Sequence, residues 1–371
     1  MKTIKIRMLI MLVLVSIIAA GCGSNASPAQ TGSSQPPASN GAPSSNEQAG
    51  NAGSNNEQAS EDTGEKIYLY GNDFVDVIGP LFTEQTGYEL EAVHYGGGEA
   101  LAKIEAERGN PQWDVLLMDG HGSIRSLADR DFLLTGWQPP EIELLSDYGQ
   151  SVLPDDYAYF PVGIHAAAVI AYNKGLVSAE AAPKTWEQFF SFDGPVGHAD
   201  PAVAAPAYPL VSAFFHKWGV DEAKELYAKR MKDGLHVYPK NGPVGQALVS
   251  GEIHVAALQE HNAYSLKEAG EPIEVIWPDE GAPGSLRVAA ISKHTKNPAA
   301  AKAFVSFIMQ PETQQLLTTL ESNDSFFTPM AEGVSTREER REDGTFMLPD
   351  AQWAAEHELE IKTWFADQNV K

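Results

Sequence analysis

Residues 66–94 read KIYLYGNDFVDVIGPLFTEQTGYELEAVH and contain the pattern that decides the fold. A β-like run at 66–70 is followed by a Gly-Asn-Asp loop and by a helical stretch at 74–86, which Gly87 closes. A second β-like run follows at 89–94. Short strands that alternate with helices of this length are typical of parallel α/β units. The stretch therefore predicts an α/β fold.

The same alternation continues to the end of the chain. We expect further strands at 114–118, 196–199, 237–238, 254–258, 274–277 and 288–291. We expect helices at 99–108, 123–130, 221–232, 263–269, 298–309, 311–320 and 350–365, and one after Asp200-Pro201. Residues 159–173 read as two extended runs around Pro161-Val162-Gly163, where we expect a hinged crossing between two lobes. The expected organisation is a first lobe at 66–160, the crossover and second lobe at 161–290, and C-terminal helices at 291–371 that return toward the first lobe.

The N-terminus has the pattern of a secretory signal. Its first seven residues carry three basic side chains and no acid, and an apolar run follows at 8–20. That run is shorter than the roughly 20 residues of a transmembrane helix, so it indicates a signal peptide. The segment ends in Ala19-Ala20-Gly21-Cys22, which resembles a lipoprotein signal-peptidase site. We therefore expect a signal peptide at 1–21 and an acylated Cys22, which is the chain's one cysteine.

Residues 23–65 have the composition of a tether. They contain no Val, Ile, Leu, Met, Phe, Trp or Tyr. Such a segment cannot bury enough apolar surface to offset the loss of chain entropy, so we expect it to be disordered. Together with Cys22 it would form a lipid-anchored linker, residues 22–65, that holds a globular domain on the outer face of the cytoplasmic membrane.

Charge and motifs exclude several classes of function. The chain has 26 basic and 50 acidic residues, and removal of the three basic residues of the signal leaves 23 against 50, a net charge of −27. This balance argues against nucleic acid as a partner, because nucleic-acid binding needs a basic surface. There is no Gly-x-Ser-x-Gly elbow, no His-Glu-x-x-His pair and no phosphate-loop motif. We expect neither an enzyme nor a cofactor, and we expect a monomer.

Several segments resemble ferric-ion-type binding proteins of bacterial importers. They are Tyr70-Gly71-Asn72-Asp73, the stretch 104–115 (IEAERGNPQWDV), Ala171-Tyr172-Asn173-Lys174, 183–187 (PKTWE) and 297–304 (NPAAAKAF). The resemblance covers roughly residues 67–320. It implies the type II periplasmic-binding-protein fold, in which two α/β lobes joined by crossover strands close on a solute. It also implies an ABC permease as partner. A sensor that feeds a membrane histidine kinase remains an alternative, because the same fold serves both uses.

Candidate ligand-binding residues lie in loops that follow the expected strands, where ligands bind in open α/β sheets. Gly-rich turns at 96–98 and 241–242 precede helices, whose N-termini favour anions. Each of these features has a plainer structural explanation. The Gly turn could simply connect a strand to a helix, and Asp200 could cap a helix. Each His could be a solvated side chain, and Tyr264 could be a packed aromatic residue. The candidates are Asn72, Asp73, Tyr95, Gly96, Gly97, Gly98, Asp119, His121, Asp200, Asn241, Gly242, His261, Asn262 and Tyr264.

The identity of the solute depends on the segment after the strand that ends near Leu258. The ferric-binding relatives place two adjacent tyrosines there, whereas this chain reads His261-Asn262-Ala263-Tyr264. At most one tyrosine remains for Fe(III). We therefore favour a small anion such as a phosphonate or a sugar phosphate. The alternative is a metal site made by Glu260, His261 and Tyr264, with iron or an iron complex as the solute.

Overall fold

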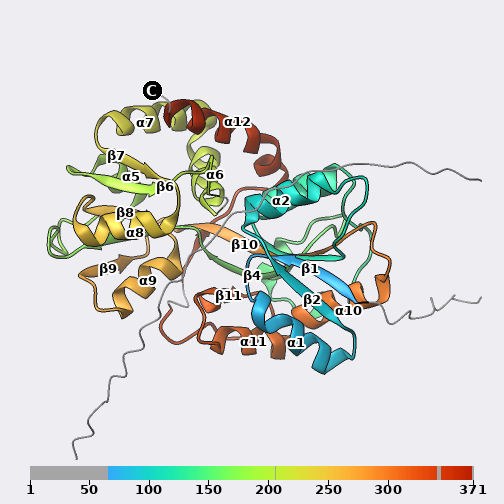
Figure 1. The fold of residues 1–371 in the computed structure, drawn as a ribbon. Coiled ribbons are helices and arrows are strands. Elements are labelled where there is room, and N and C mark those ends of the chain that lie inside the picture. Colours follow the sequence, from blue (N-terminus) through green and yellow to red (C-terminus); the bar gives the residue numbers. More distant parts are fainter. Residues whose placement is uncertain (1–65, 205, 341–343, 370–371) are drawn as a thin grey trace, which may run out of the picture. The chain divides into compact units, whose positions relative to one another are not determined.

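The protein is described by a computed structural model that covers residues 66–204, 206–340 and 344–369. The predicted signal peptide at 1–21, Cys22 and the tether at 22–65 lie outside these residues. Within them the chain forms two β-sheets, each flanked by helices, so the predicted α/β class is confirmed (Figure 1). None of the helices in these ranges is both long and apolar enough to cross a membrane.

The first sheet carries the N-terminal strands, in the order β11-β4-β10-β3-β1-β2, and β12 pairs with β10. The strands β1, β2 and β3 are parallel, whereas β10 runs antiparallel to both β3 and β4. The strand bounds are β1 Ile67–Gly71, β2 Leu90–His94, β3 Val115–Asp119, β4 Phe160–Ala166, β10 Ala282–Ile291, β11 Thr328–Pro329 and β12 Phe346–Met347. The associated helices are α1 Val75–Thr86, α2 Gly97–Ala106, α3 His121–Asp129, η1 Pro140–Leu144, α4 Asp147–Ser151, α10 Pro298–Met309, α11 Pro311–Thr319 and η2 Asn323–Ser325.

The second sheet has the order β7-β6-β8-β5-β9. Its strands β6, β7 and β8 are parallel, and β5 runs antiparallel to β8 and β9. The strand bounds are β5 Val169–Asn173, β6 Val196–Ala199, β7 Leu235–Tyr238, β8 Val255–Leu258 and β9 Ile273–Ile276. The helices are α5 Trp186–Ser191, α6 Ala207–Trp218, α7 Val220–Lys232, α8 Asn241–Ser250 and α9 Glu260–Glu268.

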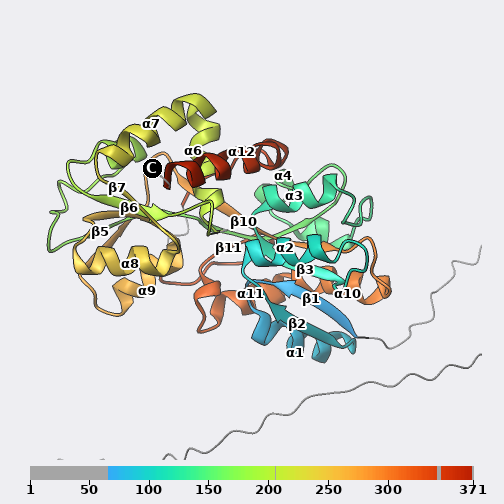
Figure 2. The ribbon, with the colours of Figure 1, turned by 45° about the horizontal axis from the view of Figure 1, so that its top comes forward.

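The chain crosses between the sheets at Ala167 and Ala168, which separate β4 from β5 (Figure 2). The predicted hinge, Pro161 to Gly163, lies instead inside β4, where it pairs with β10. A second crossing joins β9 to β10 and runs beside the first, since the Ala167 N–H donates to the Pro283 carbonyl at 2.8 Å. The crossing thus lies after the predicted Pro161-Val162-Gly163, and a part of these three residues in a hinge stays a prediction.

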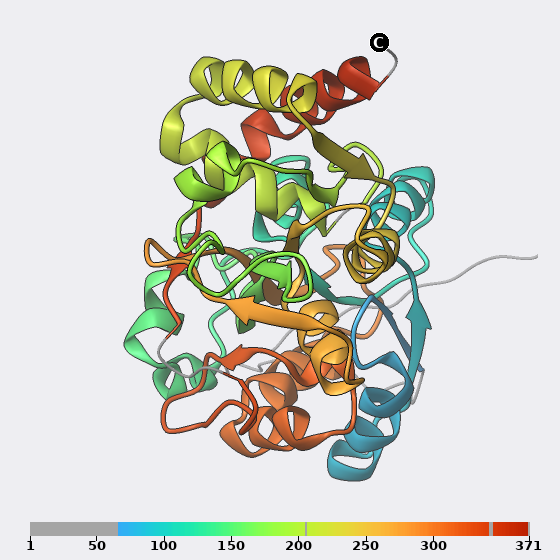
Figure 3. The same cartoon turned by 90° about the vertical axis from the view of Figure 1, so that its left-hand side faces the viewer.

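The last helix, α12 (Ala351–Asn369), packs against both α3 and α6, and Figure 3 shows it beside α7. Its Ile361 and Phe365 are buried, and the Phe365 ring lies 5.1 Å from that of Tyr227 in α7. Trp353 and Trp364 are only half-buried at the edge of this contact. The helix thus joins the cores that belong to the two sheets.

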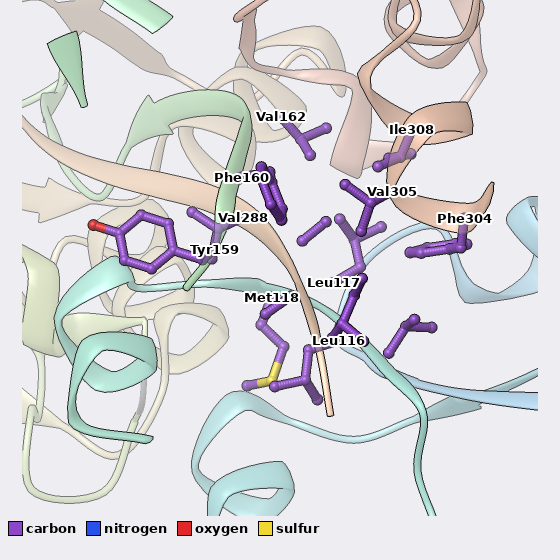
Figure 4. Packing of buried hydrophobic residues seen from close by; sticks show 14 of the residues in the cluster. Leu116, Leu117, Met118, Tyr159, Phe160, Val162, Val288, Phe304, Val305 and Ile308 are labelled. Atoms are coloured by element: carbon purple, nitrogen blue, oxygen red, sulfur yellow. The ribbon is translucent and has the colours of Figure 1, made fainter. Parts of the chain in front are cut away.

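The core of the first lobe lies between β3, β4, β10 and helix α10 (Figure 4). Strand β3 begins Val-Leu-Leu-Met, and all four side chains are buried, as expected for a strand with helices on both faces. Helix α10 contributes a buried stripe of Ala301, Phe304, Val305 and Ile308. The Asn297 side chain caps the helix by accepting the Ala300 N–H at 3.2 Å. This rigid core fixes the ends of β1 and β3, where polar residues gather.

Three elements differ from the sequence prediction in ways that affect the site. Strand β10 begins at Ala282 rather than at 288, although its first half, Ala-Pro-Gly-Ser-Leu-Arg, contains two residues that are rare in strands. Helix α9 begins at Glu260, so residues predicted to form a loop occupy its first turn. Helix α6 begins at Ala207, several residues after Asp200.

Candidate functional site

Polar residues collect at the carboxyl ends of the parallel strands in both sheets. In the first sheet, Asn72 and Asp73 follow β1, and Asp119 ends β3. In the second sheet, Asn241 follows β7 and Gln259 follows β8. Carboxyl ends of parallel strands lie along one edge of a sheet, so each group is brought together by topology. The contacts described below connect the two groups.

The group on the first sheet is built around a buried arginine of β10. Arg287 stands opposite Asp119 in the antiparallel register, and its Nε donates to Asp73 Oδ2 at 2.7 Å. The Asn72 amide bridges the two carboxylates, with Nδ2 at 3.0 Å from Asp73 Oδ1 and 3.2 Å from Asp119 Oδ2. The Arg287 Nη1 reaches the backbone carbonyl of Asp324 at 3.1 Å. Arg287 is only 2% exposed, and its buried charge thus has carboxylate and carbonyl partners.

Two aromatic rings hold the Arg287 guanidinium in place. Its carbon lies 4.8 Å from the Phe74 ring centroid and 4.9 Å from that of Phe327. Gly163 makes room for this arrangement, because a Cβ there would lie 2.3 Å from the Phe327 ring. Phe74 has a φ of 57°, a left-handed conformation that is strained for an aromatic residue. Its N–H donates to Asp324 Oδ2 at 3.0 Å, which helps to maintain the turn that presents Asp73.

A chain of side chains connects this group to the second sheet. His165 Nδ1 lies 3.7 Å from Asp119 Oδ1, and its Nε2 lies 3.3 Å from Gln259 Nε2. Gln259 Oε1 accepts from Asn241 Nδ2 at 2.8 Å, at the first residue of α8. The series Asp119–His165–Gln259–Asn241 therefore runs from the end of β3 to the start of α8. Asp119 Oδ1 and His165 Nδ1 are buried and have no hydrogen-bond partner in the described part of the chain.

Helix α9 contributes the remaining residues near this chain. His261 is in its first turn and close to Asp73, Asp324 and Arg287, whose charges act on its titration. The Asn262 Oδ1 is buried without a hydrogen-bond partner among the described residues. Tyr264 contacts other residues through both its hydroxyl and its ring. The hydroxyl accepts from Trp277 Nε1 at 3.1 Å, and the ring stacks on that of Phe326 with the centroids 5.5 Å apart.

Glu260 is fully buried in an ion pair with Arg340, and its Oε2 also accepts the Ala166 N–H at 2.8 Å. No group of three or more His, Cys, Asp or Glu within the described ranges is placed to hold a metal ion. Glu260 is engaged by Arg340 and Ala166, and the Tyr264 hydroxyl by Trp277, so a metal site made by Glu260, His261 and Tyr264 stays a prediction.

Other predicted residues lie apart from the chain of contacts. Gly96 to Gly98 form the start of α2 at the end of β2, and the Tyr95 ring packs edge-on against Tyr70 at 4.9 Å. His121 is buried at the start of α3, with Nε2 at 2.9 Å from the Pro349 carbonyl. Asp200 accepts the Ala202 N–H at 2.8 Å. Gly242 is exposed in the first turn of α8. For all these residues, a part in ligand binding stays a prediction.

Burial controls the protonation of the cluster. Burial raises the pKa of Asp73 to about 6, against the lowering effect of Arg287, and it also raises the pKa of Asp119. Burial, aided by the charge of Arg287, lowers the pKa of His165 to about 3. His165 is therefore neutral at pH 7, and the positive charge of the cluster comes from Arg287.

Hollows in the surface lie at several places, and one of about 700 Å³ is lined by the predicted residue His121. One of about 480 Å³ is bordered by Asn72 and Asp324, at the ends of β1 and β2. A larger one of about 920 Å³ lies on the second lobe, between α5 and α7, and touches none of the predicted residues. We give more weight to the smaller hollow, because it adjoins the polar cluster.

Comparison with known proteins shows the family of the chain. The sequence model of the family described as "Bacterial extracellular solute-binding protein" matches residues 81–347. An uncharacterised protein of Haemophilus influenzae is 26% identical over 273 residues, which cover 67% of this chain and 76% of that protein. A Salmonella typhi protein, whose name proposes it as a 2-aminoethylphosphonate-binding periplasmic protein, is 23% identical over 293 residues, covering 76% and 81% of the two chains.

Solved structures share the fold. Iron-bound HitA from Pseudomonas aeruginosa superposes with a TM-score of 0.70 at 21% identity and covers 81% of this chain and 99% of its own. AfuA from Actinobacillus pleuropneumoniae, with fructose 6-phosphate bound, gives a TM-score of 0.69 at 22% identity and covers 82% and 99%. The bilobal type II fold expected from the resemblance is thereby confirmed.

Sequence reasoning missed three contributors to the cluster: His165, Arg287 and Asp324. His165 and Arg287 both interrupt apolar strands, in FPVGIHAAAV (160–169) and SLRVAA (285–290). A charged or polar residue within an otherwise apolar strand is rarely buried without partners. That signal was present in the sequence. Asp324 carried no such signal, since it lies in a polar turn after α11.

Proposed function

We propose, from the fact that this chain belongs to the family of bacterial extracellular solute-binding proteins, that it captures a small phosphonate or phosphate ester between its two lobes. Solute-binding proteins of this type serve ABC importers, and the relatives with descriptive names are binding proteins. Delivery of the solute to a membrane permease is part of the proposal.

The observation that carries this proposal is the series Asp119–His165–Gln259–Asn241. It connects the edges of both sheets at which the parallel strands end, and it contains two buried polar atoms without hydrogen-bond partners among the described residues. Buried polar atoms without partners are unfavourable, and a ligand or an ordered water removes the penalty. A solute that reaches this series would contact both lobes at once. This is the geometry that a two-lobed capture protein requires.

Two features support an anionic group on the solute. Helix α8 begins at Asn241, within the series, and the N–H groups of Asn241 and Gly242 have no acceptors inside the helix, whereas Pro243 has no N–H. The next residue is Gly242, which is exposed, and a Cβ there would meet no atom within 4 Å, so a ligand can approach the backbone. 2-Aminoethylphosphonate, after which the Salmonella typhi relative is named, carries such a group. Fructose 6-phosphate, which is bound in the AfuA structure, also carries one. Iron is the second candidate, because HitA is iron-bound.

Thermal unfolding of the purified full chain tests the solute class. We expect 2-aminoethylphosphonate or fructose 6-phosphate to raise Tm by several degrees, because a ligand at about 100 times its Kd adds about 2.7 kcal/mol to the free energy of unfolding. Fe(III) and inorganic sulfate serve as controls and should leave Tm unchanged. Stabilisation by Fe(III) alone, with no response to any phosphonate or phosphate ester, would contradict the proposal and favour iron.

We further propose that Cys22 is acylated and anchors the protein outside the cytoplasmic membrane. Cys22→Ser should move the protein from the membrane fraction to the soluble fraction, because the substituted chain has no thiol to carry the lipid chains that anchoring needs. Immunoblots of both fractions measure this, with a tether substitution such as Ser34→Ala as the matched control, which should stay in the membrane fraction. Unchanged membrane partitioning of Cys22→Ser would refute the anchor.

A further inference from the structure

The cluster at the ends of β1 and β3 has an excess of negative charge. One guanidinium, that of Arg287, stands among three carboxylates: Asp73, Asp119 and Asp324. The imidazoles of His165 and His261 do not compensate, since burial lowers the pKa of both. Excess buried charge is unfavourable unless a proton or a cation balances it.

Arg287 is already committed to partners other than Asp119. Its Nε and Nη2 face Asp73, its Nη1 donates to the backbone of Asp324, and its two faces are covered by aromatic rings. The distance from its Nε to Asp119 Oδ1 is 3.5 Å, which is long for a hydrogen bond. Asp119 therefore shares the charge of Arg287 weakly. Its Oδ1 remains without a hydrogen-bond donor among the described residues.

Three polar atoms without partners stand on the same face of the first sheet. They are Asp119 Oδ1, His165 Nδ1 and Ser285 Oγ. Ser285 is directly opposite His165 in the register of β10 and β4, and Arg287, two residues farther along β10, is opposite Asp119. The Asp119 and His165 side chains are 8% and 4% exposed. Because the Gln259 Nε2 group can only donate toward His165 Nε2, the proton of the neutral imidazole is on Nδ1, which faces Asp119. The Asp119 carboxylate and the Ser285 hydroxyl can each accept a hydrogen bond, and an ammonium group has three to donate.

The hollow of about 480 Å³ next to this face also has an excess of negative charge. Asn72 borders it and donates to Asp119. Three of the described residues that line it are acidic (Asp76, Glu321 and Asp324), and none of them is Lys or Arg. A cationic group is thus favoured both in the hollow and at Asp119, whereas a bare anion would meet repulsion there.

We propose that the solute carries a protonated amine in addition to its anionic group, and that Asp119 and Ser285, beside His165, form the ammonium subsite. The inference rests on the proposed function for the anionic end, which α8 would hold. The raised pKa of Asp73 and of Asp119 is in keeping with negative charge that is buried without full compensation. An ammonium group at Asp119 supplies a balancing charge. The solute class is therefore a small amino-phosphonate or amino-phosphate zwitterion.

Titration calorimetry on the full chain with three probes tests the subsite. The probes are 2-aminoethylphosphonate, 2-hydroxyethylphosphonate, which is similar in size but lacks the positive charge, and putrescine, which lacks the phosphonate. We expect the amino compound to bind at least about tenfold more tightly than the hydroxy compound, because charge-assisted hydrogen bonds are stronger than neutral ones.

The outcomes separate this inference from the proposed function. Equal or tighter binding of 2-hydroxyethylphosphonate overturns the ammonium subsite and leaves the phosphonate function standing. Binding of putrescine without either phosphonate retains the subsite and overturns the anionic class. No binding of any probe overturns both. The comparison uses the unaltered protein, so it does not depend on whether a variant folds.

Substitution of Asp119 assigns the effect to a residue. Asp119→Asn should lower the affinity for 2-aminoethylphosphonate about tenfold and leave that for 2-hydroxyethylphosphonate nearly unchanged, because only the amine depends on the carboxylate charge. Glu141→Gln is the matched control: Glu141 is a buried carboxylate of the same lobe that accepts from Ser306 and Gln310 at 2.9 and 3.0 Å. Equal losses for both ligands in Asp119→Asn would mean that Asp119 only maintains the structure.

Discussion

Replacing Arg287 with Met is expected to lower the free energy of unfolding by about 3–5 kcal/mol at pH 7, because removal of one partner of a buried ion pair leaves an unpaired charge. Arg287 and Asp73 are 2% and 7% exposed, so water cannot take the place of the lost guanidinium. Urea denaturation of the ligand-free protein measures the loss. Arg125→Met is the control, since the partners of Arg125 are more than a third exposed and such pairs contribute at most about 1 kcal/mol.

The loss of unfolding free energy in Arg287→Met, called the deficit below, should be larger at high pH than at low pH. The pKa of Asp73 in the folded protein is raised to about 6 from an ordinary value of 3.8, so the stability that its protonation provides is complete below about pH 4 and is lost as pH rises through 6. Removal of Arg287 takes away the charge that holds this pKa down. The deficit should therefore be smaller at pH 5 than at pH 8. A deficit below 1 kcal/mol, or one equal at both pH values, would contradict this account.

Much of the fold could be predicted because its signals are local. Gly87 ends α1 in a left-handed conformation, and Asn297 with Pro298 starts α10, as their positions in the sequence indicated. Strand β10 could not be predicted in full, because its pairing partners are about 120 and 170 residues away and its own Pro and Gly argue against a strand. Local propensity was overridden there by the two neighbouring strands.

The site was predictable only where topology alone places residues together. Asn72 and Asp73 follow β1, and Asp119 ends β3 at the same edge of the first sheet, where hydrogen bonds join the three. Asn241 follows β7 of the second sheet and is hydrogen-bonded to Gln259. The counter-charge came from the interior of β10, as Arg287, which no loop pattern could reveal. Prediction from loops therefore gave the acceptors of the site but not the cation that organises them.

A second buried ion pair joins the two lobes where the chain crosses. Glu260 begins α9 on the second sheet, and Arg340 lies beside β11 of the first, where it also donates to the Thr328 hydroxyl. Both side chains are at most 1% exposed. Glu260 also accepts the N–H of Ala166, the last residue of β4 before the crossing at Ala167. The pair thus fixes α9, and with it His261, against the end of β4.

A double-mutant cycle on this pair gives the last prediction. Arg340→Met and Glu260→Gln should each lower the free energy of unfolding of the ligand-free protein by about 3–5 kcal/mol, since each leaves a buried polar partner unsatisfied. The double variant should be more stable than the sum of the two losses implies, by about 0.5–3 kcal/mol, because the two side chains interact directly. If Glu260 were instead a metal ligand, Glu260→Gln would weaken Fe(III) binding while leaving the ligand-free stability close to that of the unaltered protein. Urea denaturation of the four proteins, followed by Fe(III) titration of the unaltered protein and Glu260→Gln, decides between an interlobe ion pair and a metal site.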